Sequence, residues 1–191
     1  MPSLQGHLLL ASSMLTDPNF HRSVILMVQH DPDGGAMGLI LNRPLQANIK
    51  EVCTEQFDFE CAVDGPLHLG GPCEQTLMVL YSESSPAETS DGVRVMDGIC
   101  LASDKSKIES LLLDPQSDVK CFVGYAGWAP GQLEAEIEHG AWLATPATRE
   151  EIFRTGAGDG AGKDQWQELM NRLTLGKYID PDRMPEDPNL N

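Results

Sequence analysis

The stretch Gly-Tyr-Ala-Gly-Trp-Ala-Pro-Gly-Gln-Leu-Glu-Ala-Glu, residues 124–136, combines special backbone positions with large aromatic rings. It follows residues 119–123, which are rich in strand formers. Gly127 permits a positive φ or a close approach of the backbone to another segment, and Pro130 has the preset φ of a first helical position. Gly140 lies where a helix commonly ends. The stretch therefore predicts a strand, a tight corner and a short helix.

The predicted corner has two interpretations. In the first, free N–H groups at Gly131 and Gln132 point toward the end of the strand and hold an anion. In the second, the corner is a packing device in which Trp128 fills the core. Glu134 and Glu138 are four residues apart, so they fit either a solvated acidic helix face or a chemical role. The residues alone leave these alternatives open.

Residues 124–134 also resemble the signature of the AlgH/YqgE family of bacterial proteins. Four further segments match that family in order and spacing: Gly-His-Leu-Leu-Leu-Ala (6–11), Phe-His-Arg-Ser-Val-Ile (20–25), Gly-Ala-Met-Gly-Leu-Ile-Leu-Asn-Arg-Pro (35–44) and Gly-Gly-Pro (70–72). The resemblance covers nearly the whole chain up to about Gly176. Cys73 departs from it, because the family more usually has an aliphatic residue there.

The resemblance implies a fold but no chemistry. The fold is α+β, with a mixed, largely antiparallel sheet curled into a pseudo-barrel and flanked by helices. Members of the family are often labelled transcriptional regulators, after a link to alginate synthesis. No enzymatic activity, cofactor or catalytic residue comes with the family, so the resemblance assigns none to this chain.

The charge of the chain limits its partners. Lys and Arg number 13 against 29 Asp and Glu, which gives a formal net charge of −16. Attraction to phosphate backbones and anionic membranes depends on Lys and Arg, and the sequence has no Lys/Arg cluster and no clear helix-turn-helix. The composition therefore argues against direct nucleic-acid binding and membrane attachment. A regulatory role would have to be indirect, through a protein partner.

Length and composition predict one cytoplasmic domain. The 191 residues suit a single α+β domain over 1–176, followed by a polar tail over 177–191 that holds three prolines. There is no basic leader segment and no run of roughly 20 apolar residues. The five cysteines are odd in number and lack a Cys-x-x-Cys spacing, which favours inert thiols over a disulfide framework or a zinc site.

Hydrophobic patterning places the remaining elements. Strands are predicted at 8–11, 23–30, 36–42, 76–81, 93–96, 99–102 and 142–144, and helices at 49–57, 104–113 with Ser103 as cap, 148–153 with a capping box, and 164–173. The Asp-Pro-Asp-Gly-Gly run at 31–35 lacks the remaining ligands of a calcium loop. The glycine-rich segment 155–162 lacks the context of a nucleotide-binding loop. We therefore expect no metal and no cofactor.

Two functional hypotheses follow. The first is a non-enzymatic regulatory or binding protein, acting on a small molecule or protein through glycine- and proline-rich strand ends that we expect to converge. This candidate surface comprises Asn42, Arg43, Gly70, Gly71, Tyr125, Gly127, Trp128, Gln132 and Glu134. The alternative is an enzyme of unknown reaction, with His30, Glu134 and His139 as acid–base groups and Arg43 holding a small anionic substrate.

Overall fold

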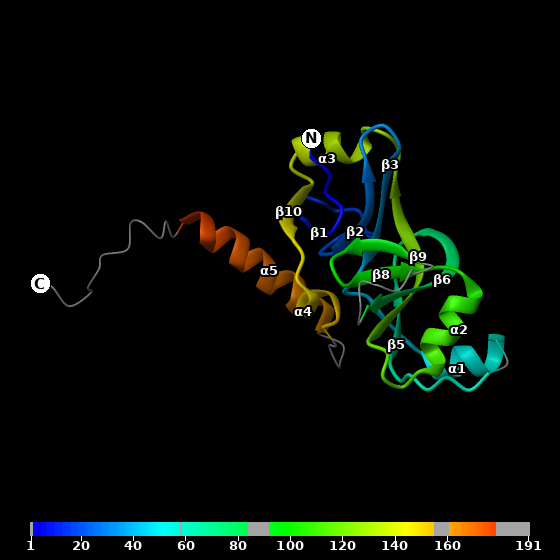
Figure 1. The fold of residues 1–191 in the computed structure, drawn as a ribbon. Helices are drawn as coiled ribbons and strands as arrows, with labels where there is room; N and C mark the ends of the chain where they lie inside the picture. The colour runs from blue at the N-terminus through cyan, green and yellow to red at the C-terminus, as the bar shows by residue number, and fades with distance from the viewer. Residues whose placement is uncertain (1, 58, 84–91, 155–160, 179–191) are drawn as a thin grey trace, which may run out of the picture.

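The computed structural model describes residues 2–57, 59–83, 92–154 and 161–178 (Figure 1). Its strands are β1 (His7–Ala11), β2 (Val24–Asp31), β3 (Gly35–Ile40), β4 (Pro44–Asn48), β5 (Pro66–Leu69), β6 (Cys73–Ser82), β7 (Val93–Met96), β8 (Ile99–Ala102), β9 (Val119–Trp128) and β10 (Trp142–Pro146). Its helices are α1 (Ile49–Val52), continued by a π-helical segment (Cys53–Phe57), then α2 (Lys105–Leu113), α3 (Gln132–Glu138), α4 (Arg149–Ile152) and α5 (Ala161–Tyr178).

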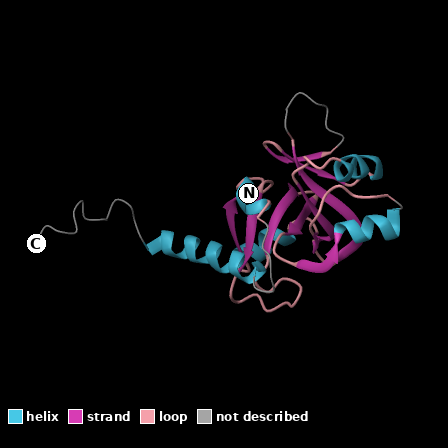
Figure 2. Cartoon of the chain, turned by 90° about the horizontal axis from the view of Figure 1, so that it is seen from below, coloured by secondary structure: helices cyan, strands magenta, loops and turns pink. Residues whose placement is uncertain are grey.

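The predicted α+β class and largely antiparallel sheet are confirmed. The strand order is β10-β1-β2-β3-β9-β6-β8-β7, and β4 and β5 pair beside this path. The pairing of β5 with β9 is parallel, and the other described pairings are antiparallel. The sheet curls strongly without closing into a barrel (Figure 2). In Figure 1, α3 lies at one end of β3 and β9, and α1 and α2 lie at the opposite end of the molecule.

Strand β9 organises the molecule because it pairs with β3, β5 and β6. Before Gly124, Phe122 joins one buried cluster and Val123 packs against a second. Gly124 then takes a positive φ of 73°, after which Ala126 and Trp128 belong to a third cluster. The left-handed conformation of Gly124 thus allows one strand to contribute side chains to three hydrophobic clusters.

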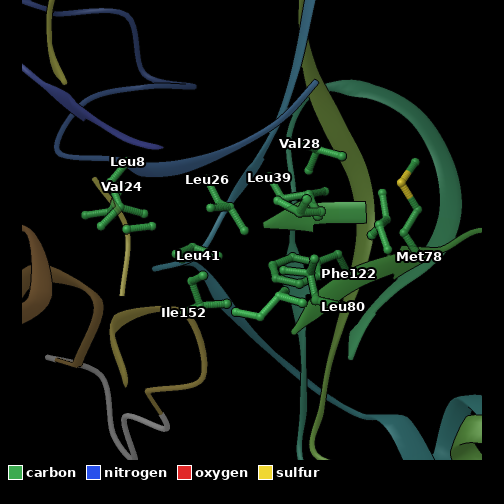
Figure 3. Packing of buried hydrophobic residues seen from close by; sticks show 14 of the residues in the cluster. Leu8, Val24, Leu26, Val28, Leu39, Leu41, Met78, Leu80, Phe122 and Ile152 are labelled. Carbon is green, nitrogen blue, oxygen red and sulfur yellow. The ribbon is translucent and has the colours of Figure 1, made fainter. Parts of the chain in front are cut away.

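The largest core fills the interior of the curled sheet. Leucine, valine and methionine side chains from β1, β2, β3 and β6 surround Phe122, which is fully buried (Figure 3). Ile152 of α4 and Trp166 of α5 cover one side of this core, and the Trp166 indole N–H donates to the carbonyl of Ala11 at 2.8 Å. The continuous apolar run of β2 is buried at every position from Val24 to Val28, as its sequence predicts.

The corner after β9 differs from its prediction. The strand continues through Gly127 to Trp128, and Pro130 precedes the helix instead of opening it. Gly131, at a φ of 74°, is the N-cap of α3, and the Gln132 side-chain oxygen accepts the N–H of Ala129. The backbone N–H of Gln132 donates to the Ala129 carbonyl. The N–H of Gln132, one of the two groups predicted to hold an anion, is thus engaged by a local bond.

Smaller differences concern helix ends. Asp104, not Ser103, caps α2, and its carboxylate accepts the N–H groups of Ser106 and Lys107. The predicted capping box of Thr148 and Glu151 is present at α4. Helix α5 is longer than predicted and runs through the expected domain boundary at residue 176.

Two of the predicted segments lie mostly beyond the described part of the chain: residues 155–160 of the glycine-rich loop and residues 179–191 of the tail. Among the residues that are described, no helix is long and apolar enough to span a membrane.

Candidate functional site

The structure brings together part of the predicted surface at a close crossing of two backbones. A Cβ added to Gly70 would lie 2.1 Å from the carbonyl oxygen of Gly124, and one added to Gly71 would lie 2.2 Å from the carbonyl carbon of Tyr125. The carbonyl of Gly70 also accepts the N–H of Ile40 at 2.8 Å. The end of β5, the middle of β9 and the end of β3 therefore form one rigid unit, called here the strand crossing.

The other predicted residues lie at opposite ends of β3. Ala36 pairs with Trp128, so Trp128, Gln132 and Glu134 lie near the start of β3. Asn42 and Arg43 follow its end, about 20 Å away at roughly 3.3 Å per residue. The expected convergence is thus partial: the glycines and Tyr125 meet, and the two flanking groups do not meet each other.

Asn42 and Arg43 hold the segment between β1 and β2. The Asn42 amide donates to the Arg22 carbonyl and accepts the N–H of Val24, both at 2.9 Å. The Arg43 guanidinium donates to the carbonyls of Pro18 and His21 at 3.2 and 3.3 Å. Burial lowers the pKa of Arg43, and the nearby carboxylate of Asp17 opposes this shift. These contacts give both side chains a structural role in anchoring that segment.

Trp128 and Gln132 belong to a partly buried polar clamp centred on Glu136 of α3. One carboxylate oxygen of Glu136 accepts the indole N–H of Trp128 at 2.9 Å and that of Trp142 at 2.8 Å. The other oxygen accepts the Gln132 amide at 2.8 Å. The two indoles meet edge to face at 6.0 Å, and Phe20 stacks on Trp128 at 6.3 Å. The packing interpretation of the corner therefore accounts for Trp128.

Two of the proposed acid–base groups form a pair. His30 Nε2 lies 2.9 Å from Glu134 Oε1, and the His30 side chain is 1% exposed. His30 Nδ1 accepts the backbone N–H of Leu4 at 3.0 Å, so Nε2 carries the proton and donates to Glu134. Both ring nitrogens are thus engaged in fixing the N-terminal segment and α3. His139 is exposed and bonds to the Ala135 carbonyl.

The strand crossing also carries a partly buried face that continues from the largest core, against which Tyr125 and Met37 pack. Tyr125 pairs with Cys73, and Gly127 pairs with Met37. Residues two apart on a strand share a face, so these four residues, called here the Tyr125 face, lie side by side. Gly127 is exposed, and a Cβ placed on it would lie 3.3 Å from the Tyr125 ring and 3.6 Å from the Cys73 sulfur. The absent side chain leaves a notch between a phenol and a thiol.

Glu74 borders this face with a strained backbone. Its φ of 24° is a conformation that non-glycine residues rarely adopt. Its carboxylate raises the pKa of Tyr125, with smaller contributions from burial and from Cys73. Strained residues persist where the surrounding structure fixes them, as the strand crossing does here.

The thiols differ in accessibility, which leads to a prediction. All five cysteines are described; Cys73 is partly exposed, and the other four are buried. Burial raises the pKa of Cys53 and of Cys121 to about 12, and the neighbouring thiol of Cys61 contributes to both shifts. We expect Ellman's reagent at pH 8 to label one thiol per native chain rapidly, and the others only after denaturation, because the reactive species is an accessible thiolate.

The Cys73→Ser variant is the control for this labelling. It should lose the rapid reaction completely while its denatured form still titrates four thiols. A second rapidly reacting thiol in the native protein would show that the core around β6 and β9 opens more readily than its burial indicates.

Sequence reasoning missed Met37 and Glu74 as neighbours of Tyr125. Their place depends on the register of β3 and β6 against β9, which a single chain does not reveal. Cys73 could have been selected from the sequence, because it directly follows the predicted Gly-Gly-Pro turn.

The model of a protein family described as AlgH-like matches residues 8–177. The chain belongs to the AlgH-like family. The UPF0301 protein CT0663 of Chlorobaculum tepidum is 37% identical to it over 194 residues, covering 97% of this chain and 95% of the relative. The UPF0301 protein YqgE of Escherichia coli O1:K1 / APEC is 36% identical over 176 residues, covering 87% and 89%. The predicted family membership is confirmed.

Two solved structures support the fold. The solution structure of the AlgH protein from Pseudomonas aeruginosa matches with a TM-score of 0.70 and 26% identity, covering 94% of this chain and 95% of that one. The crystal structure of protein DIP2367 from Corynebacterium diphtheriae matches with a TM-score of 0.72 and 25% identity, covering 90% and 87%.

Proposed function

We propose that this AlgH-like protein is a non-enzymatic binding protein that docks a protein partner on the Tyr125 face. The observation that carries the proposal is the notch at Gly127, open to solvent between Tyr125 and Cys73. A partner side chain inserted there would contact the phenol, the thiol and bare backbone together. Any effect on transcription would then pass through that partner.

The composition of the face supports a protein ligand. Tyrosine and methionine are enriched in protein interfaces, where they supply large contact areas, and Tyr125 and Met37 lie on adjacent strands. The face is carried by the strand crossing, whose backbones are too close to move independently. A surface that is rigid before binding loses little entropy when it docks a partner.

The contacts of His30 argue against the enzyme alternative. A general base needs a nitrogen that can take a proton from a substrate. In His30 one ring nitrogen already accepts from Leu4, the other donates to Glu134, and the ring is buried. Arg43, the proposed anchor of a small anionic substrate, donates to two backbone carbonyls instead.

The net charge of −16 supports a protein rather than a nucleic acid as partner. Nonspecific DNA binding arises from Lys and Arg contacts to phosphates, and a strongly acidic chain is repelled from the same backbone.

Labelling through Cys73 tests the proposal. A benzophenone maleimide attached to this thiol places a photoreactive group on the Tyr125 face, because the other cysteines are buried. We expect irradiation in a lysate of the native cells to give one dominant cross-linked partner. Gly127→Leu in the same labelled protein should abolish that product, since its side chain fills the notch.

A matched probe distinguishes specific docking from chance contact. Ser110 is exposed on α2, remote from the Tyr125 face, so Ser110→Cys in a Cys73→Ser background carries the same reagent elsewhere. That probe should not yield the partner. Identical cross-linked products from both positions would overturn the proposal.

A further inference from the structure

A second feature lies on the other side of β6, where α2 covers the sheet. A cavity of about 210 Å³ opens between them. Its walls are apolar and come from Phe59, Leu77, Ile108 and Leu112. Ile108 and Leu112 are buried and belong to the cluster that includes Cys53 and Cys121, so the floor of the cavity is core.

The polar residues that line this cavity are Thr76 of β6, and Ser103 and Lys105 beside the start of α2. The Lys105 side chain is 70% exposed, and its ion pair with Glu109 is long, at 3.6 Å. Within the described part of the chain, the Ser103 hydroxyl makes no hydrogen bond, because Asp104 performs the capping that the sequence assigned to Ser103. One ammonium group and two hydroxyl groups, those of Lys105, Ser103 and Thr76, therefore lie beside an otherwise apolar cavity.

We propose that this cavity binds a medium-chain aliphatic carboxylate, with the chain against Leu77, Ile108 and Leu112 and the carboxylate on Lys105 and Ser103. Burial of an apolar chain in such a cavity is favourable in proportion to the area removed from water. The volume accommodates about seven water-sized groups at roughly 30 Å³ each, which matches a chain of about eight carbons.

The charges at the start of α2 favour an acid over a neutral lipid. The Asp104 carboxylate is turned toward the N–H groups of Ser106 and Lys107, and its pKa is lowered, chiefly by the hydrogen bond from the Ser106 side chain. The negative charge of Asp104 therefore interacts with the N–H groups at the start of α2. The ammonium group of Lys105 is then the group that can pair with the carboxylate of a ligand. An exposed ion pair of this kind adds modest affinity to the apolar contacts.

Titration with octanoate, followed by methyl NMR, tests the assignment. We expect saturable shifts of the Leu77, Ile108 and Leu112 methyl signals, and intermolecular NOEs from octanoate to Leu112. Leu77→Trp, which fills the cavity, should abolish the shifts. Lys105→Glu should weaken octanoate binding about three- to fivefold, as expected for loss of an exposed pair, and leave octan-1-ol binding unchanged.

Lys107→Glu is the matched charge control. Its ammonium lies 5.1 Å from the ring of Tyr81, outside the cavity, so this variant should bind octanoate as wild type does. Absence of saturable methyl shifts would overturn the proposal, as would equal weakening by the Lys105 and Lys107 variants. Should Leu77→Trp fail to fold, the NOEs to Leu112 in the wild-type protein decide the question alone.

Discussion

Replacing Gly124 with alanine is expected to destabilise the fold by about 4 kcal/mol, whereas Gly131→Ala should cost about 1 kcal/mol. The two glycines share a left-handed backbone, with φ of 73° and 74°. They differ in their surroundings: a Cβ on Gly124 would lie 2.5 Å from the carbonyl oxygen of Gly71, and one on Gly131 would meet nothing within 4 Å. Both variants strain the backbone, so the difference between their free energies of unfolding measures the steric clash at the strand crossing.

Urea denaturation of the two variants and the wild type at pH 7.5 measures this difference. Equal free energies of unfolding for Gly124→Ala and Gly131→Ala would contradict the close approach of β5 to β9. Should Gly124→Ala fail to fold while Gly131→Ala folds, the expected order of effects still holds.

The pH dependence of stability is expected to have a large contribution from His68. Burial lowers the pKa of His68 to about 4, and the neighbouring ammonium of Lys120 contributes. In the unfolded chain the pKa is about 6.5. The folded state therefore keeps His68 neutral at pH values where the unfolded state binds a proton, so its contribution is complete above pH 6.5 and declines as the pH falls toward 4.

This linkage should remove about 2 kcal/mol of stability between pH 7.5 and pH 5. His68→Phe should lack that loss, because phenylalanine does not titrate and keeps a ring beside Phe122, whose centroid is 5.5 Å from that of His68. Urea denaturation at both pH values, performed above the sequence pI of about 4.5, gives the slope.

His21→Phe provides the comparison, since it makes the same replacement at an exposed histidine. It should therefore show the wild-type pH dependence. If the free energy of unfolding of His68→Phe and of His21→Phe falls by the same amount between the two pH values, the claim that folded His68 stays neutral is wrong.

The local elements were largely predictable because short patterns determine them. The strands predicted at 23–30, 93–96 and 99–102 and the capping box predicted at the start of α4 all occur in the structure. Each depends on residues within one or two turns of chain, where propensity and side-chain bonding act directly.

The long-range pairings could not be predicted in this way. His30 meets Glu134 across 104 residues, and Gly70 meets Gly124 because β5 pairs with β9 in parallel. Gly124, not Gly127, carries the positive φ, since the register of β9 against β6 places the change of face there. The pattern of apolar residues along one sequence predicts which face of a strand is buried, but it does not predict which strand pairs with which.

The candidate site was therefore found only in part. Tyr125 and Gly127 were recognised from the density of glycines and rings around them. Met37 and Cys73 complete the Tyr125 face through cross-strand register, which no local pattern encodes. Conversely, Trp128 and Gln132 were selected by the same local signal and prove to be parts of the Glu136 clamp.

The most direct test of the Tyr125 face is the dissociation constant of the cross-linked partner for two leucine variants. Gly127→Leu fills the notch, whereas Gly65→Leu adds the same side chain where nothing lies within 4 Å. Isothermal titration calorimetry should show at least about tenfold weaker binding for Gly127→Leu, since loss of a central contact costs more than roughly 1.4 kcal/mol, and wild-type binding for Gly65→Leu. Equal dissociation constants for the two folded variants would contradict the assignment of this face.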